Sequence, residues 1–371
     1  MSLGLEPQVT AIDASPVVDR PPAAGSWRHR HLLDVDVLSW ADTELVLRTT
    51  DAMREVLARP IAKVPALRGT NVTILFYEAS TRTRVSFEVA AKNLSADVVN
   101  IAAASSSVSK GESLIDTVKT VEALGARMLV MRHATSGAPY LAAQHFGGHV
   151  LNGGDGWHAH PTQALLDLYT IREALVHGPG AGGAGVGTAG AGGAVPLDGR
   201  FLRGRKVVIL GDILHSRVAR SNIWTLTAAG ADLWLCGPAT LLRGFEAWAR
   251  HGAGGPAGIG HRFTVTSDVS AALRDADVVM ALRIQRERME GGLLPSLREY
   301  GARFGLTNAR LGAAKPAAVV MHPGPMNEGV EIAADVASGP HSVITDQVTN
   351  GVAVRMALLY LLAGAGESAG G

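Results

Sequence analysis

The sequence predicts an α/β protein with two doubly wound parallel-sheet domains. Short apolar, β-branched segments alternate along the chain with longer segments of helical periodicity, which is typical of parallel βαβ units. The alternation stops once, at a stretch rich in glycine and alanine over 178–199, and then resumes. A chain of 371 residues, 47% of them hydrophobic, also exceeds the size at which one core usually splits. We therefore expect one domain over 31–173 and a second over 174–347.

The individual elements follow from local patterns. Short apolar runs predict strands near 72–77, 97–101, 127–131, 149–152, 206–211, 231–236 and 276–282. Apolar residues at helical spacing predict helices near 40–59, 84–94, 112–124 and 139–146, and from Pro161 to about Glu173. The last helical pattern runs from Val352 to about Leu362. We expect the segment 348–364 to pack back on the first domain.

Two segments show neither pattern. Residues 1–30 contain several prolines and no apolar period over most of their length, which predicts a disordered tail. Gly185 to Gly190 match the dinucleotide fingerprint G-x-G-x-x-G by letter, but no apolar strand precedes them and no helical pattern follows. We therefore interpret 178–199 as a loop insertion that binds no nucleotide.

Composition excludes several classes of function. Lys and Arg number 34 against 33 Asp and Glu, so a formal charge of +1 offers no global field for nucleic acid or an anionic membrane. The single cysteine, Cys236, cannot form an intrachain disulfide and fits a small hydrophobic position at a strand end. Without an apolar span of about 18 residues or a signal-peptide pattern, we expect a soluble, cytoplasmic protein. We expect no metal, because the neighbouring His158 and His160 lack a carboxylate or cysteine at ligand spacing. The sequence also has no P-loop, and we expect no cofactor.

The most informative stretch is Ser80-Thr81-Arg82-Thr83-Arg84, which joins a predicted strand to a predicted helix. Free backbone N–H groups and the positive end of the macrodipole favour an anion at a helix N-terminus. Three hydroxyls and two guanidinium groups add donors there, and Arg82 can bind a phosphate through two N–H groups. An N-cap serine beside surface arginines would explain one hydroxyl but not the whole run. We therefore predict a phosphate-binding site.

Further polar residues follow other predicted strands of the first domain. Parallel sheets bind ligands at the carboxyl ends of their strands, so these residues are candidates for the same site. Arg132 closes an apolar strand and is placed to reach the same anion as Arg82. His160 precedes Pro161 at a helix start, where its ring could donate to a carbonyl oxygen or cap the helix. The residues alone leave both roles open, and a lone arginine at a strand end also fits an exposed surface.

Polar groups that could bind a ligand also occur in the second domain and in a serine-rich loop of the first domain. Arg217 opens a predicted helix of the second domain, and Arg283 and Gln285 follow a predicted strand, so two guanidinium groups and an amide suit a dicarboxylate. Each of these residues alone also fits a solvated position. Ser109 and Glu112, at the end of a serine-rich loop, have the spacing of a capping box, and a solvated loop is the simple interpretation.

The run at 80–84, followed by Ser86-Phe87-Glu88, resembles the carbamoyl-phosphate signature of the aspartate and ornithine carbamoyltransferases. The resemblance covers about 31 to 362 and implies an active site shared between subunits of a homotrimer. Ornithine carbamoyltransferases typically carry Cys at the place of Thr162 and His-Cys-Leu-Pro at the place of 322–325, which here is His-Pro-Gly-Pro. Both differences favour aspartate as the second substrate.

The resemblance also implies roles for individual residues. Carbamoyl phosphate would be bound by Ser80, Thr81, Arg82, Thr83, Arg132, His160, Gln163, Gly324 and Pro325. L-aspartate would be bound by Lys110, Arg217, Arg283 and Gln285. A neighbouring subunit would supply Ser106 and Lys110, and catalysis would rest on Arg82, Thr83, Arg132, His160 and Lys110.

The implied reaction forms N-carbamoyl-L-aspartate and phosphate, a step towards pyrimidines, by positioning substrates and stabilising an oxyanion. A transcarbamoylase for a cationic amine is an alternative, but it would need carboxylates where Arg217 and Arg283 stand. A second alternative is a non-catalytic assembly partner, for instance of dihydroorotase. Glu328, where many relatives carry arginine, favours that alternative. Association with a regulatory chain is also left open.

Overall fold

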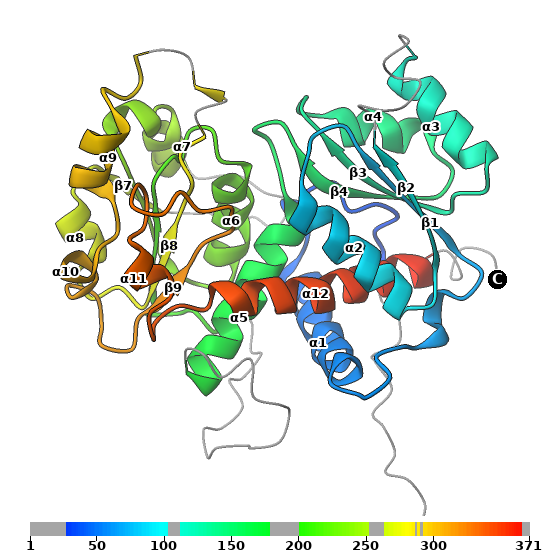
Figure 1. Cartoon of the computed structure of the whole chain (residues 1–371), viewed down its shortest axis with the longest axis horizontal. Helices are drawn as coiled ribbons and strands as arrows, with labels where there is room; N and C mark the ends of the chain where they lie inside the picture. Colours follow the sequence, from blue (N-terminus) through cyan, green and yellow to red (C-terminus); the bar gives the residue numbers. More distant parts are fainter. Residues whose placement is uncertain are drawn as a thin grey trace, which may run out of the picture.

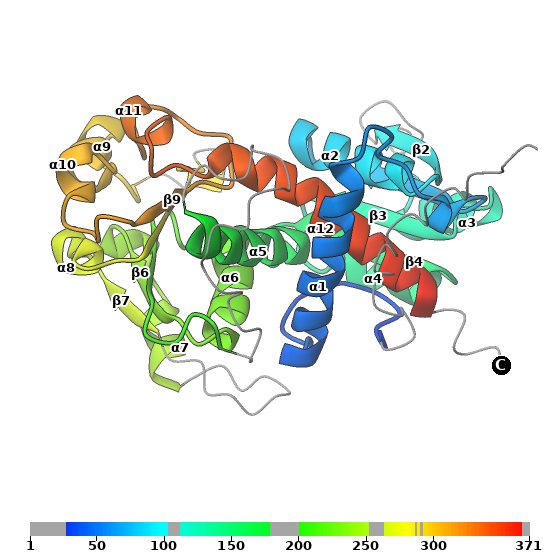
Figure 2. The same ribbon diagram turned by 90° about the horizontal axis from the view of Figure 1, so that it is seen from below.

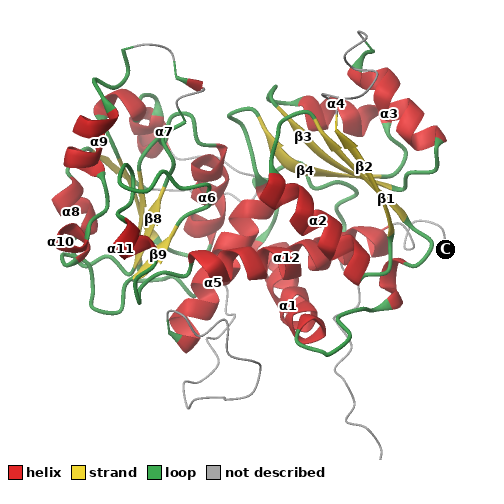
Figure 3. Cartoon of the chain, in the orientation of Figure 1, coloured by secondary structure: helices red, strands yellow, loops and turns green. Residues whose placement is uncertain are grey.

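The computed structural model describes residues 27–102, 112–178, 200–251, 263–285, 288–289 and 292–365. These residues form two parallel sheets with helices packed on both faces of each (Figures 1 and 3). The strand order is β2-β1-β3-β4 in the first sheet and β7-β6-β5-β8-β9 in the second. An early strand lies inside each sheet and later strands extend it in both directions, as in doubly wound folds. The predicted fold class is confirmed.

The first sheet comes from the first part of the chain. Its strands are β1 (Asn71–Phe76), β2 (Asp97–Ala102), β3 (Met128–His133) and β4 (His149–Asp155). The helices are α1 (Trp40–Leu57), α2 (Thr81–Asn93), α3 (Leu114–Ala123), α4 (Ala138–His145) and α5 (Pro161–His177), with a 3-10 helix at Pro65–Leu67. All of the predicted elements of this part are found within a few residues of their expected positions. Helix α3 is capped by Ser113, whose Oγ accepts from the Asp116 N–H at 3.2 Å, whereas Ser109 lies outside the described residues.

Alternating side chains of the first sheet enter two different cores. In β1, Ile74 packs in a cluster with residues of α1, α2 and α5. Its neighbour Leu75 packs with Val118 of α3 and Ala142 of α4 on the other face. Helices α3 and α4 therefore cover one face of the sheet, and α2 covers the opposite face (Figure 1).

The second sheet comes from the later part of the chain. Its strands are β5 (Lys206–Leu210), β6 (Asp232–Cys236), β7 (Thr264–Thr266), β8 (Val278–Ala281) and β9 (Val319–Met321). Its helices are α6 (Arg217–Ala228), α7 (Phe245–His251), α8 (Val269–Leu273), α9 (Leu297–Phe304), α10 (Asn308–Leu311) and α11 (Ala334–Ala337), with a 3-10 helix at Ala239–Leu241. Strands β5, β6 and β8 match predictions, but β7 and β9 were not predicted because three residues cannot display a period of two. Cys236 ends β6 fully buried, and burial raises the pKa of its thiol to about 12, so it packs as a small hydrophobic residue, as predicted.

The last helix, α12 (Ile344–Ala365), packs against α1, α2 and α5, as expected for the C-terminal segment. Figures 1 and 2 show α12 starting beside α5, near the second sheet, and running across α2 and α1 of the first domain. The predicted start at Val352 is wrong, because Gln347 and Asn350 interrupt the apolar pattern. Both are buried, and their amides donate to Asp167 Oδ1 at 2.8 Å and to Thr170 Oγ1 at 3.1 Å.

Helix α12 is also more apolar than its sequence pattern predicts. It has 22 residues, and an 18-residue window of it reaches a mean hydropathy of 1.5, enough in length and composition to cross a membrane. In the folded chain 61% of that window is buried against other helices. Such burial is typical of the core helix of a soluble protein.

Candidate active site

A cavity of about 780 Å³ is lined by segments that follow β1, β3 and β4 of the first sheet and β5, β8 and β9 of the second. The carboxyl ends of parallel strands therefore meet at one place, as doubly wound folds predict. Among the described residues, Glu78 is the one acidic residue that lines the cavity. Six arginines line it as well: Arg82, Arg132, Arg217, Arg283, Arg288 and Arg355. This excess of guanidinium groups makes the potential positive and suits anionic ligands.

The predicted phosphate motif lies at the N-terminus of α2. Ser80 is the N-cap residue with an extended backbone, and its Oγ accepts from the Thr83 N–H at 3.4 Å. Ser80, Thr81, Arg82 and Thr83 all line the cavity. The first N–H groups of α2 and the positive end of its dipole thus lie at the cavity wall.

The guanidinium group of Arg82 lies against the loop that follows β9. A Cβ atom at Gly324 would lie 2.6 Å from Cζ of Arg82, and Gly324 has a φ of +63°. The left-handed backbone favours glycine at this position, and a side chain there would displace the guanidinium group of Arg82. Burial and the nearby Arg283 lower the pKa of Arg82. Arg82 of the first domain, Arg283 of the second and Pro325 of the β9 loop thus line one cavity.

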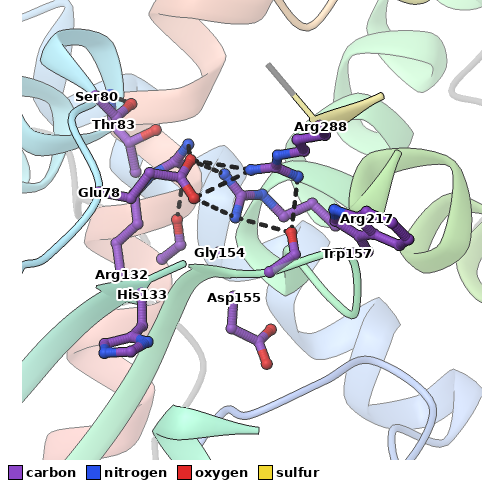
Figure 4. Close-up of polar contacts among 12 residues, drawn as sticks. Glu78, Ser80, Thr83, Arg132, His133, Gly154, Asp155, Trp157, Arg217 and Arg288 are labelled. Carbon is purple, nitrogen blue, oxygen red and sulfur yellow. Dashed lines mark hydrogen bonds and ion pairs between the residues drawn. The ribbon is translucent and has the colours of Figure 1, made fainter. Parts of the chain in front are cut away.

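Arg132, at the end of β3, is buried and held by two acceptors. Its Nη2 donates to Glu78 Oε1 at 2.5 Å, and its Nη1 donates to the Gly153 carbonyl oxygen at 3.2 Å (Figure 4). Burial and the neighbouring Arg217 lower the pKa of Arg132 to about 9. The guanidinium group therefore keeps its charge at neutral pH.

Glu78 connects the two domains through its carboxylate. Besides Arg132, it accepts from Arg217 Nη2 at 2.5 Å and from Arg288 Nη2 at 3.0 Å (Figure 4). Burial by itself would raise the pKa of Glu78, but the hydrogen bond from Arg217 and the surrounding guanidinium charges lower it below its usual value. Glu78 is therefore ionised and binds arginines of both domains.

The backbone of the first domain also binds these second-domain arginines. Nη1 of Arg217 and Nη1 of Arg288 donate to the Gly156 carbonyl oxygen at 3.2 and 2.8 Å (Figure 4). The next residue, Trp157, stands edge-on to His215 of the second domain, with ring centroids 4.9 Å apart. These contacts join the two domains beside the cavity.

His160 lies in the cavity wall with only 4% of its surface exposed. His160 is the N-cap residue of α5, and its backbone N–H donates to Ser221 Oγ at 2.9 Å. Its ring makes no capping hydrogen bond to the helix, so the alternative in which the side chain caps α5 is wrong. Burial and the charge of Arg132 lower the pKa of His160 well below its usual value. The imidazole is therefore neutral, and its Nδ1 has no hydrogen-bond partner among the described residues. Gln163, one turn later, also lines the cavity and donates to Asp167 Oδ1 at 2.9 Å.

The predicted acceptor residues lie on the second-domain side. Arg217 is the first residue of α6, after the N-cap Ser216. Arg283 and Gln285 follow β8, and the Gln285 N–H donates to Asp212 Oδ2 at 3.2 Å. Arg217, Arg283 and Gln285 all line the same cavity as Ser80 to Thr83.

The remaining predicted residues, Ser106 and Lys110, lie outside the described part of the chain, so their placement stays a prediction. Glu78 and Arg288 also lie at the site, although neither was predicted as a site residue. Each lies within three residues of a predicted site residue, which is a usable but weak signal. Their contacts span 139 and 210 positions of the chain, and no local pattern encodes such a pairing.

Two models of one protein family match most of the chain. Residues 30–173 match the aspartate/ornithine carbamoyltransferase, carbamoyl-P binding domain, and residues 203–362 match the Asp/Orn binding domain of the same family. The aspartate carbamoyltransferase catalytic subunit of Roseiflexus sp. (strain RS-1) is 56% identical over 337 residues, covering 91% of this chain and 96% of the relative. The catalytic subunit of Chloroflexus aggregans is 53% identical, covering 91% and 99%.

Solved structures give the same result. Aspartate transcarbamoylase from Trypanosoma cruzi, in complex with carbamoyl phosphate and aspartate, matches with a TM-score of 0.74 and 26% identity over 92% of this chain and 99% of that one. Ornithine carbamoyltransferase from Thermus thermophilus shares the fold, with a TM-score of 0.71 at 22% identity over 90% and 99%. The chain belongs to the aspartate/ornithine carbamoyltransferase family.

Proposed function

We propose that this chain is the catalytic chain of an aspartate carbamoyltransferase. In this proposal it converts carbamoyl phosphate and L-aspartate into N-carbamoyl-L-aspartate and phosphate, in the biosynthesis of pyrimidines. One observation carries the proposal: Arg82 at a helix N-terminus of the first domain and Arg217 and Arg283 of the second domain line a single cavity. Two anionic substrates need two sets of donors, and their reacting groups would meet between them.

Carbamoyl phosphate would be bound by the first domain, residues 31–173 together with 348–364. Its phosphate would accept hydrogen bonds from the backbone and hydroxyls of Ser80 to Thr83 and from Arg82. Arg132 and His160 would contact the carbonyl oxygen, because both lie in the wall at the ends of neighbouring strands. Gln163 would contact the carbamoyl amino group, and Gly324 and Pro325 would complete the wall.

L-aspartate would be bound by the second domain, residues 174–347. Arg217 and Arg283 would each bind one carboxylate, and Gln285 would orient one of them. The ammonium group of L-ornithine would instead meet guanidinium charges, and none of the described lining residues near Arg217 or Arg283 except Glu78 is acidic. The charge of this half therefore supports aspartate as the acceptor.

The proposed reaction needs no cofactor, because the substrate supplies its own nucleophile. The α-amine of aspartate attacks the carbonyl carbon, an oxyanion forms, and the C–O bond to phosphate breaks as the amine loses a proton. Arg132 and neutral His160 would donate to the oxyanion, and a donor of this kind contributes on the order of 100-fold or more in rate. Burial of His160 keeps it a hydrogen-bond donor rather than a second cation.

We also propose a cytoplasmic homotrimer whose neighbouring subunit supplies Ser106 and Lys110. Exposed valines support an interface on this side of the first domain: Val85 and Val89 on one face of α2, 45% and 38% exposed, and Val99 on edge strand β2, 43% exposed. A regulatory chain or dihydroorotase would bind to this trimer as a further partner. The exposed Glu328, where many relatives carry arginine, is a candidate contact residue for such a partner.

The test is an assay of purified protein with carbamoyl phosphate and either L-aspartate or L-ornithine, followed for the carbamoylated amine. We expect product with aspartate alone. Product with ornithine alone would contradict the assignment of the acceptor. No product with either amine, in protein that still binds carbamoyl phosphate, would favour the assembly-partner alternative. Light scattering of the same sample tests the trimer.

A further inference from the structure

We propose that Asp167 is a positioning residue that turns the carbonyl oxygen of Gln163 towards the carbamoyl amino group, so that the site selects carbamoyl phosphate over acyl phosphates. This inference rests on the proposed function of the cavity and deepens it. It assigns a role to a side chain that lies outside the cavity wall.

Asp167 is a fully buried carboxylate surrounded by amide donors. Nε2 of Gln163 and Nε2 of Gln347 donate to its Oδ1 at 2.9 and 2.8 Å, and Nδ2 of Asn222 donates to its Oδ2 at 2.9 Å. The donors come from α5, α12 and α6, so one carboxylate joins three helices. No arginine, lysine or histidine lies within ion-pair distance of Asp167 in the described part of the chain, which distinguishes it from Glu78.

An ionised carboxylate can only accept hydrogen bonds, whereas a primary amide has one accepting oxygen and one donating nitrogen. Each glutamine beside Asp167 must therefore present its NH₂ group to the carboxylate and turn its oxygen away. Gln347 shows the consequence, since its Oε1 accepts from the His322 N–H at 2.9 Å. Asp167 thereby also holds the start of the loop that contains Gly324.

Gln163 is constrained in the same way, but its side-chain oxygen is available to a ligand in the cavity. Its side chain lines the cavity and is 8% exposed. Its Oε1 has no hydrogen-bond partner among the described residues, while its Nε2 is engaged by Asp167. The group available to a ligand is therefore an acceptor, and a flipped amide would present a donor instead.

This orientation distinguishes between two similar ligands. Carbamoyl phosphate carries an NH₂ group that can donate to Gln163 Oε1, whereas acetyl phosphate carries a methyl group of similar size that cannot. A buried acceptor left without a donor penalises the second ligand, which is how a site built around a hydrogen bond rejects an analogue.

Asp167 is ionised at neutral pH even though it is buried. Burial raises the pKa of Asp167 to about 6, and the three amide donors and the charge of Arg355 act in the opposite direction. The acceptor-only form, which orients both glutamines, therefore predominates at pH 8.

The test compares dissociation constants of carbamoyl phosphate and acetyl phosphate, measured by calorimetry at pH 8 on the full chain. In Asp167→Leu the acceptor is lost, so Nε2 of Gln163 has no partner and the amide is free to turn. We expect the preference for carbamoyl phosphate over acetyl phosphate to fall by roughly 10-fold. Asn222→Ala is the matched control, because it removes a donor from the same carboxylate without touching Gln163, and it should keep the preference.

Gln163→Met keeps the test decisive if Asp167→Leu does not fold. It removes the acceptor and should lower the preference by a similar factor. If Asp167 acts through Gln163, the double variant should show no further loss beyond Gln163→Met. An unchanged preference in Gln163→Met or in Asp167→Leu, or equal weakening of both ligands in Asp167→Leu, would overturn the inference. These binding measurements need no turnover, so failure of the proposed reaction would be seen separately in the product assay.

Discussion

The two halves of the cavity are organised on different length scales. In the first-domain half, Ser80, Thr81, Arg82 and Thr83 are consecutive residues, and Ser80 caps the helix that carries the other three. In the second-domain half, Arg217 and Arg283 lie on separate elements, and Arg217 is held by Glu78 of the other domain. The phosphate half is thus built within one domain, whereas the acceptor half depends on how the two domains meet.

The largest expected effect comes from the locally built half. Replacing Arg82 by alanine removes a guanidinium group from the anion site, and we expect kcat/KM for carbamoyl phosphate to fall on the order of 100-fold or more. The matched control is Arg84→Ala, because Arg84 is exposed on the same helix and does not line the cavity. Near-normal turnover in Arg82→Ala, measured by product formation, would remove the phosphate assignment.

Arg217→Ala tests the second-domain half of the cavity. Loss of a charge-assisted hydrogen bond to an aspartate carboxylate should raise KM for aspartate by roughly 10- to 100-fold. KM for carbamoyl phosphate should change by less than about threefold, because Ser80 to Thr83 are untouched. Steady-state kinetics with each substrate varied in turn would test this, and equal increases in both constants would show that the halves are not separable.

Glu78→Gln tests the link between the domains. The pKa of Glu78 is lowered from 4.5, so its ionised form stabilises the folded chain above pH 4.5, and this contribution is lost as pH falls through the lower folded-state value. The melting temperature of the wild type should therefore exceed that of Glu78→Gln at pH 6 to 8, and the difference should shrink below about pH 4.5. A difference that grows towards acid pH would contradict the lowered pKa.

The smallest expected effect comes from the helix cap. Ser80→Ala should lower the free energy of unfolding by about 1 kcal/mol and raise the dissociation constant of carbamoyl phosphate a few-fold. Ser113→Ala removes the equivalent cap of α3, away from the cavity wall, and should lower stability by a similar amount without changing this affinity. Equal losses of affinity in both variants would mean that Ser80 acts only through helix stability.

Much of this architecture could be predicted from the sequence. The six-residue strands β1 and β3 are long enough to show an apolar run, and each ends at a polar residue or motif that lies in the cavity wall. The three-residue strands β7 and β9 could not be predicted in the same way. The first turns of α12 were not predicted because the polar residues Gln347 and Asn350 interrupt the apolar pattern. These residues are buried through hydrogen bonds to Asp167 and Thr170, which are 180 positions away in the sequence.

The sequence by itself determined the helices of the first domain, the longer strands and the run of polar donors that begins α2, because each depends on residues that are neighbours along the chain. Only the tertiary structure decided that Glu78 binds Arg132, Arg217 and Arg288, which are 54, 139 and 210 positions away. It also decided that Asp167 collects amide donors from three helices. The physical reason is that a carboxylate has no preferred partner until folding buries it, and whether arginines or amides then surround it sets its pKa and its role.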